Sequence, residues 1–133
     1  LLSLPFPAGK ALDKLAAESD SRDAFRLRCH GAEFSLSGVE NQVQQYFAKT
    51  GDGPATARFA LRSIIGAIER ATAAALAEHP GLPVVFSGGV ASNSLLRGET
   101  LPFAAVFAAP EYSTDNAMGI ALLAWLRRRS HGA

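Results

Sequence analysis

The sequence predicts an α/β protein in which helices alternate with short apolar strands. Residues 54–79 repeat apolar side chains at helical spacing, whereas residues 83–87 and 104–108 are apolar runs of strand length. The double glycine after the first run is typical of a turn between a strand and a helix. A length of 133 residues suits one domain, so we expect a single unit over residues 1–133.

The first part of the chain predicts a helix and a hairpin. Pro7 to Glu18 places apolar residues on one helical face and ends at a Ser-Asp-Ser break. Two strand-like segments follow, Ala24–Arg28 and Ala32–Leu36, and His30-Gly31 between them suggests the hairpin turn.

Helix start signals define the middle of the chain. Ser37 and Glu40 have the spacing of a capping box, which predicts a helix from there to about Thr50. Pro54 opens the longest helix, which continues to about His79. The remaining expected elements are a strand Pro83–Ser87, a turn at Gly88 and Gly89, a short helix to about Arg97, a strand near Ala104–Ala108 and a final helix from Asp115 to Arg129.

The composition is that of a soluble globular protein, with 48% hydrophobic and 19% charged residues and a net charge of +1. No apolar run approaches the ~20 residues of a membrane span, and no signal peptide is evident. Cys29 is the only cysteine, so no internal disulfide forms and we expect a cytoplasmic protein. Because the only methionine is Met118, we expect Leu1 to follow a segment that this chain lacks.

The double glycine is the best candidate for a nucleotide or phosphate site. Gly88 and Gly89 allow close backbone approach after the strand Val84–Phe86, and the next helix would direct its first N–H groups at an anion. Asn93 is expected on the first turn of that helix. The alternative is an ordinary strand-to-helix turn without a ligand.

Asp115 is a second candidate, at the start of the last helix. A carboxylate there can serve as a helix cap or can bind a metal or a nucleotide. If the two late strands are parallel neighbours, Gly88, Gly89, Asn93 and Asp115 share one edge of a sheet, where α/β proteins bind ligands.

Gly9 and Asp13 form a third candidate near the N-terminus. Proline starts this helix, and Asp13 can be a solvated residue beside Lys10 and Lys14. Alternatively, the Gly9 backbone contacts a ligand and the Asp13 carboxylate accepts hydrogen bonds from a ribose hydroxyl.

Other catalytic classes find little support. His30, His79 and His131 share no metal-ligand spacing, and Cys29 and His30 point to opposite faces of a strand. The arginines at 127–129 complement the dipole of the last helix, with a phosphate contact to RNA as the alternative.

Four motifs occur together in one order. They are Phe6-Pro7-Ala8-Gly9, Phe34-Ser35-Leu36-Ser37-Gly38, Gly88-Gly89-Val90-Ala91-Ser92-Asn93 with Leu96-Arg97, and Thr114-Asp115-Asn116. In this the chain resembles the C-terminal half of the TsaD transferase family, formerly called glycoprotease or O-sialoglycoprotein endopeptidase. The resemblance extends from about Leu4 to Leu126.

The resemblance implies an actin-like ATPase fold, of the ribonuclease H-like type, with two lobes. Residues 1–133 would be the C-terminal lobe, and the N-terminal lobe would be absent. Family members transfer a threonylcarbamoyl group from its adenylate to an adenosine beside the anticodon of tRNA. By matching motifs, Gly9, Asp13, Asn93 and the Gly88-Gly89 turn contact the nucleotide, and Asp115 binds the metal.

The resemblance also implies cofactors and partners. An intact member would use a divalent metal, iron or zinc, and ATP or threonylcarbamoyl adenylate. The metal-binding histidine pair belongs to the missing N-terminal lobe, so we expect this chain alone to bind no cofactor tightly and to be inactive. The expected partners are that lobe, a related actin-like subunit resembling TsaB, and tRNA, without a membrane.

Several positions depart from the family pattern. Ala8, Glu40 and Ser113 stand where the family has Gly, Lys and Cys, and the connection between Arg97 and Ala104 is shorter. These departures suggest a divergent paralogue. An alternative function is a non-catalytic nucleotide-binding or assembly module that pairs with another actin-like subunit. A protease, the old family name, lacks a nucleophile with its base here.

Overall fold

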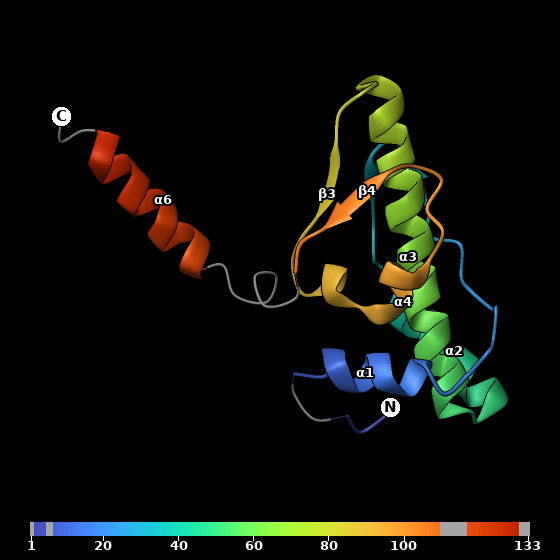
Figure 1. The fold of residues 1–133 in the computed structure, drawn as a ribbon. Helices are drawn as coiled ribbons and strands as arrows, with labels where there is room; N and C mark the ends of the chain where they lie inside the picture. The colour runs from blue at the N-terminus through green and yellow to red at the C-terminus, as the bar shows by residue number, and fades with distance from the viewer. Residues whose placement is uncertain (1, 5–6, 110–116, 131–133) are drawn as a thin grey trace.

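The protein has helices and short strands in alternation, which confirms the α/β class (Figure 1). The structure, a computed structural model, describes residues 2–4, 7–109 and 117–130. In chain order the elements are α1 (Gly9–Ala16), β1 (Cys29–His30), β2 (Glu33–Phe34), α2 (Val39–Thr50), α3 (Gly53–Glu78), β3 (Val84–Phe86), the 3-10 turn η1 (Val90–Ser92), α4 (Ser94–Gly98), β4 (Ala105–Phe107) and α6 (Ala117–Ser130).

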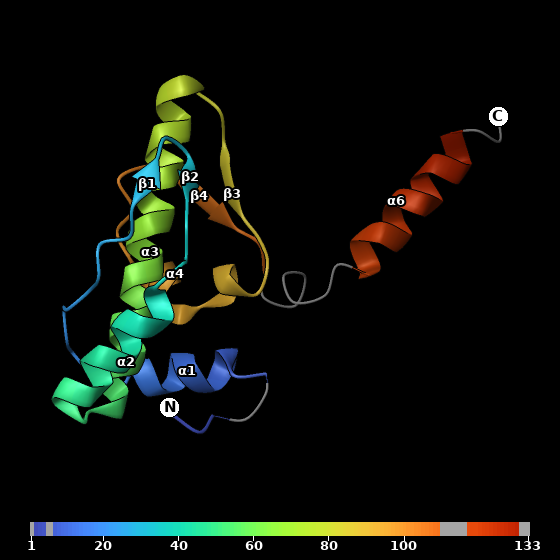
Figure 2. The same ribbon diagram turned by 180° about the vertical axis from the view of Figure 1, so that it is seen from behind.

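The long helix α3 organises the fold. Its first turn carries the expected Pro54, and the Asp52 carboxylate caps it by accepting from the Ala55 N–H at 2.9 Å. Figure 1 shows the parallel strands in front of α3, and Figure 2 shows the β1–β2 hairpin on the side seen from behind. Small side chains at Ala57 and Ala67, both fully buried, let the neighbouring segments approach the helix closely.

The two late strands pair in parallel, which meets the condition for a shared edge. Val84 lies opposite Ala105 and Phe86 opposite Phe107, so both carboxyl ends lie at one edge. The Phe86 and Phe107 rings lie 5.1 Å apart between centroids. The outer face carries Val85 and Val106, which are 63% and 64% exposed.

The hairpin is present, but its strands are shorter than expected. Cys29 pairs with Phe34 and His30 with Glu33, around a turn in which Gly31 has a φ of 57°. The expected strand Ala24–Arg28 is wrong. This segment is extended, but its backbone bonds to side chains of α3 rather than to another strand. The alternation of polar and apolar residues is the same in an extended segment and in a paired strand, so it does not tell the two apart.

The capping box is also wrong. Gly38 begins α2 with a φ of 81° and no side-chain cap, and the Glu40 carboxylate instead accepts from the Gln44 side-chain amide at 3.1 Å. That i, i+4 contact keeps Glu40 on the outer face of α2. The opposite face packs on α3, where the Tyr46 ring stacks on the Phe59 ring with 4.3 Å between the centroids.

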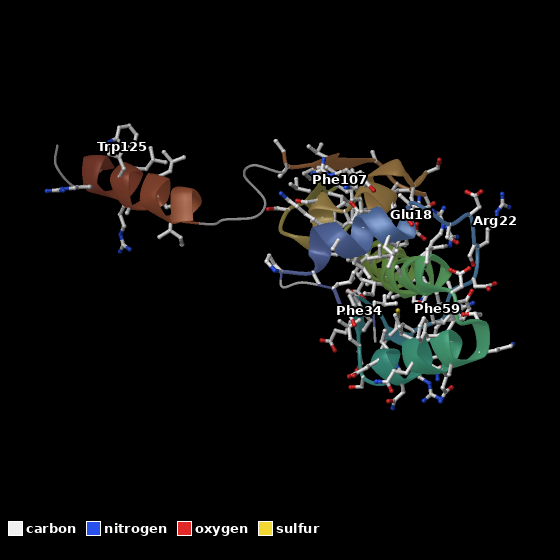
Figure 3. All side chains as sticks on the ribbon, turned by 90° about the horizontal axis from the view of Figure 1, so that it is seen from below. Glu18, Arg22, Phe34, Phe59, Phe107 and Trp125 are labelled. Atoms are coloured by element: carbon white, nitrogen blue, oxygen red, sulfur yellow. The ribbon has the colours of Figure 1, made fainter. Side chains whose placement is uncertain are left out.

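Helix α6 lies apart from the other elements in Figures 1 and 2. Ile120 and Leu123, among others, are 60% and 65% exposed, and Trp125 projects from it in Figure 3. The expected start at Asp115 lies outside the described residues. Within the described ranges, no helix is both long and apolar enough to cross a membrane.

Candidate functional site

Helix α1 is held firmly against α3. The Ala16 side chain is 1% exposed, and the Arg58 guanidinium donates to the carbonyls of Ala16 at 3.3 Å and Ser21 at 3.0 Å. One side chain of α3 therefore binds a carbonyl at the end of α1 and a second carbonyl further along the chain. This anchor fixes the helix that carries Asp13.

The Asp13 carboxylate binds the start of α4. Its Oδ1 accepts from Asn93 Nδ2 at 2.7 Å and from the Ser94 hydroxyl at 2.9 Å. The Ser94 backbone N–H donates to Oδ1 at 3.2 Å and to Oδ2 at 3.0 Å. Bonds of this kind, from neutral donors to a charged acceptor, are stronger than those between neutral groups. Asp13 is therefore bonded within the chain, which excludes the solvated-residue alternative.

Asn93 has two structural bonds. It precedes α4 as its N-cap, one position before the expected first turn, and its Oδ1 accepts from the Leu96 N–H at 3.1 Å. Its amide nitrogen donates to Asp13, and the residue is 8% exposed. One Asn93 N–H remains for a further partner, because a side-chain amide carries two donors.

The glycine turn leads from β3 into this site. Gly88 has a φ of 100°, a conformation that other residues rarely adopt, whereas Gly89 is right-handed at −59°. The Ser92 hydroxyl donates to the Gly88 carbonyl at 3.3 Å and stabilises the turn. A Cβ at either glycine would meet nothing within 4 Å, so the backbone there is open on one side.

The other predicted site residues are more peripheral. Gly9 begins α1 and is exposed, one helical turn before Asp13 and so on the same face. Among the described residues, no hydrogen bond joins Gly9 to Asn93 or to the glycine turn. Asp115 lies outside the described residues, so its position relative to the turn stays a prediction.

Arg97 links η1 to the end of β4, a role that the sequence does not reveal. Its Nε donates to the Ala91 carbonyl at 3.0 Å, Nη2 donates to the Ala108 carbonyl, and the guanidinium lies 5.2 Å from the centre of the Phe107 ring. Ser94 was missed as well. The sequence indicates Ser94 only weakly, as a hydroxyl residue directly after an N-cap asparagine. Its partner carboxylate is distant in sequence, so the contact is not evident there.

A pocket of about 890 Å³ lies between α1, α3 and α4. Asp13 and Ser94 form part of its wall, but neither glycine of the turn lines it. The remaining charged wall residues are Asp20, Arg22, Arg58, Arg62 and Glu99, so its acids and arginines balance. Of the predicted site residues the pocket therefore includes only Asp13, together with its hydrogen-bond partner Ser94, and its charge favours no one class of ion.

The ion pair in this wall affects a neighbouring carboxylate. Arg62 Nη1 lies 3.0 Å from Glu99 Oε1, while Arg62 Nε is buried without a hydrogen-bond partner among the described residues. Burial, followed by the negative charge of Glu99, raises the pKa of Glu69 above its usual value. Glu69 belongs to α3 and does not itself line the pocket.

Metal ligands do not converge in the described part of the chain. No group of three or more His, Cys, Asp or Glu side chains there could hold an ion. Asp13 is bonded to Asn93 and Ser94, and three or four ligands are typical of a protein metal site. The described residues alone therefore do not fit a metal centre.

These features define a class of protein, an α/β protein with a candidate ligand site at the edge of its parallel strands. Parallel strands end at one edge, and the turn after β3 meets a carboxylate from a distant helix, which is the region where α/β proteins bind ligands. Residues 1–122 match the family model "TsaD: tRNA N6-adenosine threonylcarbamoyltransferase", and the chain belongs to this family.

Curated relatives carry the same name, tRNA N6-adenosine threonylcarbamoyltransferase. The Granulibacter bethesdensis protein is 35% identical over 158 residues, covering 100% of this chain and 41% of that protein. Those of Carboxydothermus hydrogenoformans and Mycoplasma mobile are 31% and 32% identical, covering 96% and 95% of this chain and 41% and 43% of theirs. The chain spans about two fifths of the length of these relatives.

Proposed function

We propose that this chain is the C-terminal, actin-like lobe of a transferase that forms N6-threonylcarbamoyladenosine in tRNA. The observation that carries the proposal is the bond from Asn93 to Asp13, which joins two residues that the family motifs assign to the nucleotide. A stretch of 80 positions separates them in the sequence. Their convergence supports one ligand site formed by α1 and the glycine turn.

Each residue has a role in this proposal. Within the described part of the chain, Asp13 Oδ2 accepts only from the Ser94 N–H, so it can also accept from a ribose hydroxyl of ATP or threonylcarbamoyl adenylate. The open side of Gly88 and Gly89 lets a phosphate approach the backbone. The free N–H of Asn93 can donate to the same ligand, and Gly9 borders it on the face of Asp13.

The metal needs ligands beyond the described residues. We propose Asp115 as the one ligand from this chain, with the others from the N-terminal lobe. When bound, such an ion would polarise a phosphate or carbamoyl oxygen. The isolated chain is then expected to bind metal weakly, since metal sites need several ligands. The N-terminal lobe, a TsaB-like subunit and tRNA are the proposed partners.

The test is a chimera. This chain replaces the matched segment of the Granulibacter bethesdensis relative, and the product is assayed with threonylcarbamoyl adenylate, a divalent metal and unmodified tRNA. We expect N6-threonylcarbamoyladenosine by mass spectrometry of digested tRNA. Changing Asn93 to alanine should abolish most of it, whereas Asn41→Ala, an exposed amide on α2, should not.

The outcomes separate the candidate functions. A folded chimera without product, beside an active parent protein, would refute the transferase proposal. Calorimetry with ATP then distinguishes the remaining cases. Retained nucleotide binding without tRNA modification would favour the non-catalytic assembly module instead.

A further inference from the structure

The extended segment before the hairpin is fixed to α3 by its backbone. The Phe25 N–H donates to the Ser63 hydroxyl at 2.8 Å, and the Leu27 carbonyl accepts from Arg70 Nη2 at 3.0 Å. Ser63 is itself 2% exposed and bonded to its helix, so this support is rigid. The segment runs alongside α3 to β1 in Figure 2.

This attachment turns alternate residues outward. Leu27 is 3% exposed and Cys29 is half-buried, whereas Arg26, Arg28 and His30 are exposed. Successive side chains of an extended chain point to opposite faces, at about 7 Å between every second residue. Two arginines and a histidine therefore form a row on the side away from α3.

A pocket of about 310 Å³ lies along this row. It is lined by residues 26–30 and by Arg70, and no acidic residue lines it. Within the described ranges the ion pairs include none at Arg26, Arg28 or Arg70, since the one found joins Arg62 to Glu99. We name residues Arg26, Arg28 and His30 the arginine row, and Arg70 of α3 lines the same pocket.

Acidic residues lie near His30 and near Arg70. Glu33 is opposite His30 in the hairpin register, and the Glu69 carboxylate interacts electrostatically with Arg70 without an ion pair. Because Arg70 already donates to Leu27, its position is fixed before any ligand arrives. The two arginines of the row, Arg26 and Arg28, keep all their guanidinium donors available.

We propose that the arginine row binds the phosphate backbone of RNA, an inference that rests on the proposed function in tRNA modification. The guanidinium fork matches phosphate oxygens, and repeated cations at regular spacing suit a repeating polyanion better than a single small ion. The two unpaired arginines of the row lose no existing ion pair on binding.

The experiment measures binding of the full chain to labelled tRNA by fluorescence anisotropy at several salt concentrations. Replacing Arg26 or Arg28 by alanine should reduce the salt slope of log K by about 0.7 to 0.9 each, and the double variant by about twice that. Both side chains are exposed and form no hydrogen bond with other described residues, so these variants should fold. Lys49→Ala, an equal loss of charge on α2, should leave the slope unchanged.

Three results would overturn the proposal. They are no tRNA binding by the chain, an unchanged slope in the double variant, or equal competition by polyglutamate, which would indicate an acidic protein partner. Nucleotide binding is measured on the same samples. ATP binding that persists without RNA binding removes this inference alone, whereas RNA binding without ATP binding removes the nucleotide site and keeps the row.

Discussion

The Asp13 carboxylate accepts a 2.7 Å hydrogen bond from the side chain of Asn93, and the two residues are 80 positions apart. The same carboxylate binds the backbone N–H and hydroxyl of Ser94. Helix α1 and the start of α4 are therefore joined by a charged acceptor rather than by apolar packing alone. The candidate site therefore depends on the contact between α1 and the start of α4.

Removing the Asp13 carboxylate should destabilise the chain. We expect Asp13→Ala to lower the free energy of unfolding by about 1.5–3 kcal/mol, because donors of Asn93 and Ser94 lose a charged partner. Urea unfolding followed by circular dichroism measures this. Lys14→Ala, at the next and exposed position, is the control. Equal stability of the two variants would show that the link contributes nothing.

The two glycines of the turn should respond differently. Gly88→Ala places a side chain at a φ of 100° and should cost at least about 1 kcal/mol of stability. Gly89→Ala, at −59° with open space around it, should stay within about 0.5 kcal/mol of the wild type. Thermal unfolding measures both.

The same pair tests ligand approach. If a phosphate contacts the backbone at Gly89, a methyl group there should weaken ATP binding in calorimetry while stability is kept. Unchanged affinity in Gly89→Ala would contradict close approach at that residue.

Ser63 should be needed to hold the extended segment. Its hydroxyl accepts from the Phe25 N–H at 2.8 Å and donates to the Phe59 carbonyl at 2.6 Å. Ser63→Ala leaves that N–H without its partner and should cost about 1–3 kcal/mol. Hydrogen exchange of the Phe25 amide should accelerate more than that of α2 amides. Uniform acceleration would indicate general destabilisation instead.

Glu69 should make stability depend on pH. Its pKa is raised in the folded chain, chiefly by burial, so the folded state binds its proton more tightly than the unfolded state does. The stability that this provides is complete below the usual value of 4.5 and is lost as pH rises through the folded pKa.

The variant Glu69→Gln removes this titration. It should therefore unfold at a higher temperature than the wild type at pH 7, and the difference should vanish in acid. Glu40→Gln, on the exposed face of α2, is the matched control. A lower melting temperature of Glu69→Gln at neutral pH would contradict the prediction.

Local patterns predicted most elements and failed where the partner was distant. The helical repeat placed α3, and two apolar runs placed β3 and β4, because each pattern lies within one element. The segment Ala24–Arg28 has the alternation of a strand, yet its Leu27 carbonyl bonds to Arg70 of a helix. Glu40 fits a capping box by spacing, but the left-handed Gly38 starts the helix without it.

In the candidate site as well, short motifs indicated some residues, whereas contacts between distant elements were not predicted. Gly88, Asn93 and Asp13 were each identified from short motifs and from the resemblance to the TsaD family. Arg97 and Ser94 were not assigned roles, because their partners, Ala108 and Asp13, lie in other elements. The sequence around a side chain does not indicate which atom of a distant element that side chain will contact.

The sequence by itself determined the α/β class, the two late strands and the family, since periodicity, turn residues and motifs are local properties. Tertiary structure alone decided that the late strands pair in parallel, that Asp13 binds the start of α4, that Arg97 joins η1 to the end of β4, and that the row from Arg26 to His30 faces outward. These contacts depend on how α1 and the extended segment pack on α3, and packing sets distances that sequence separation does not encode.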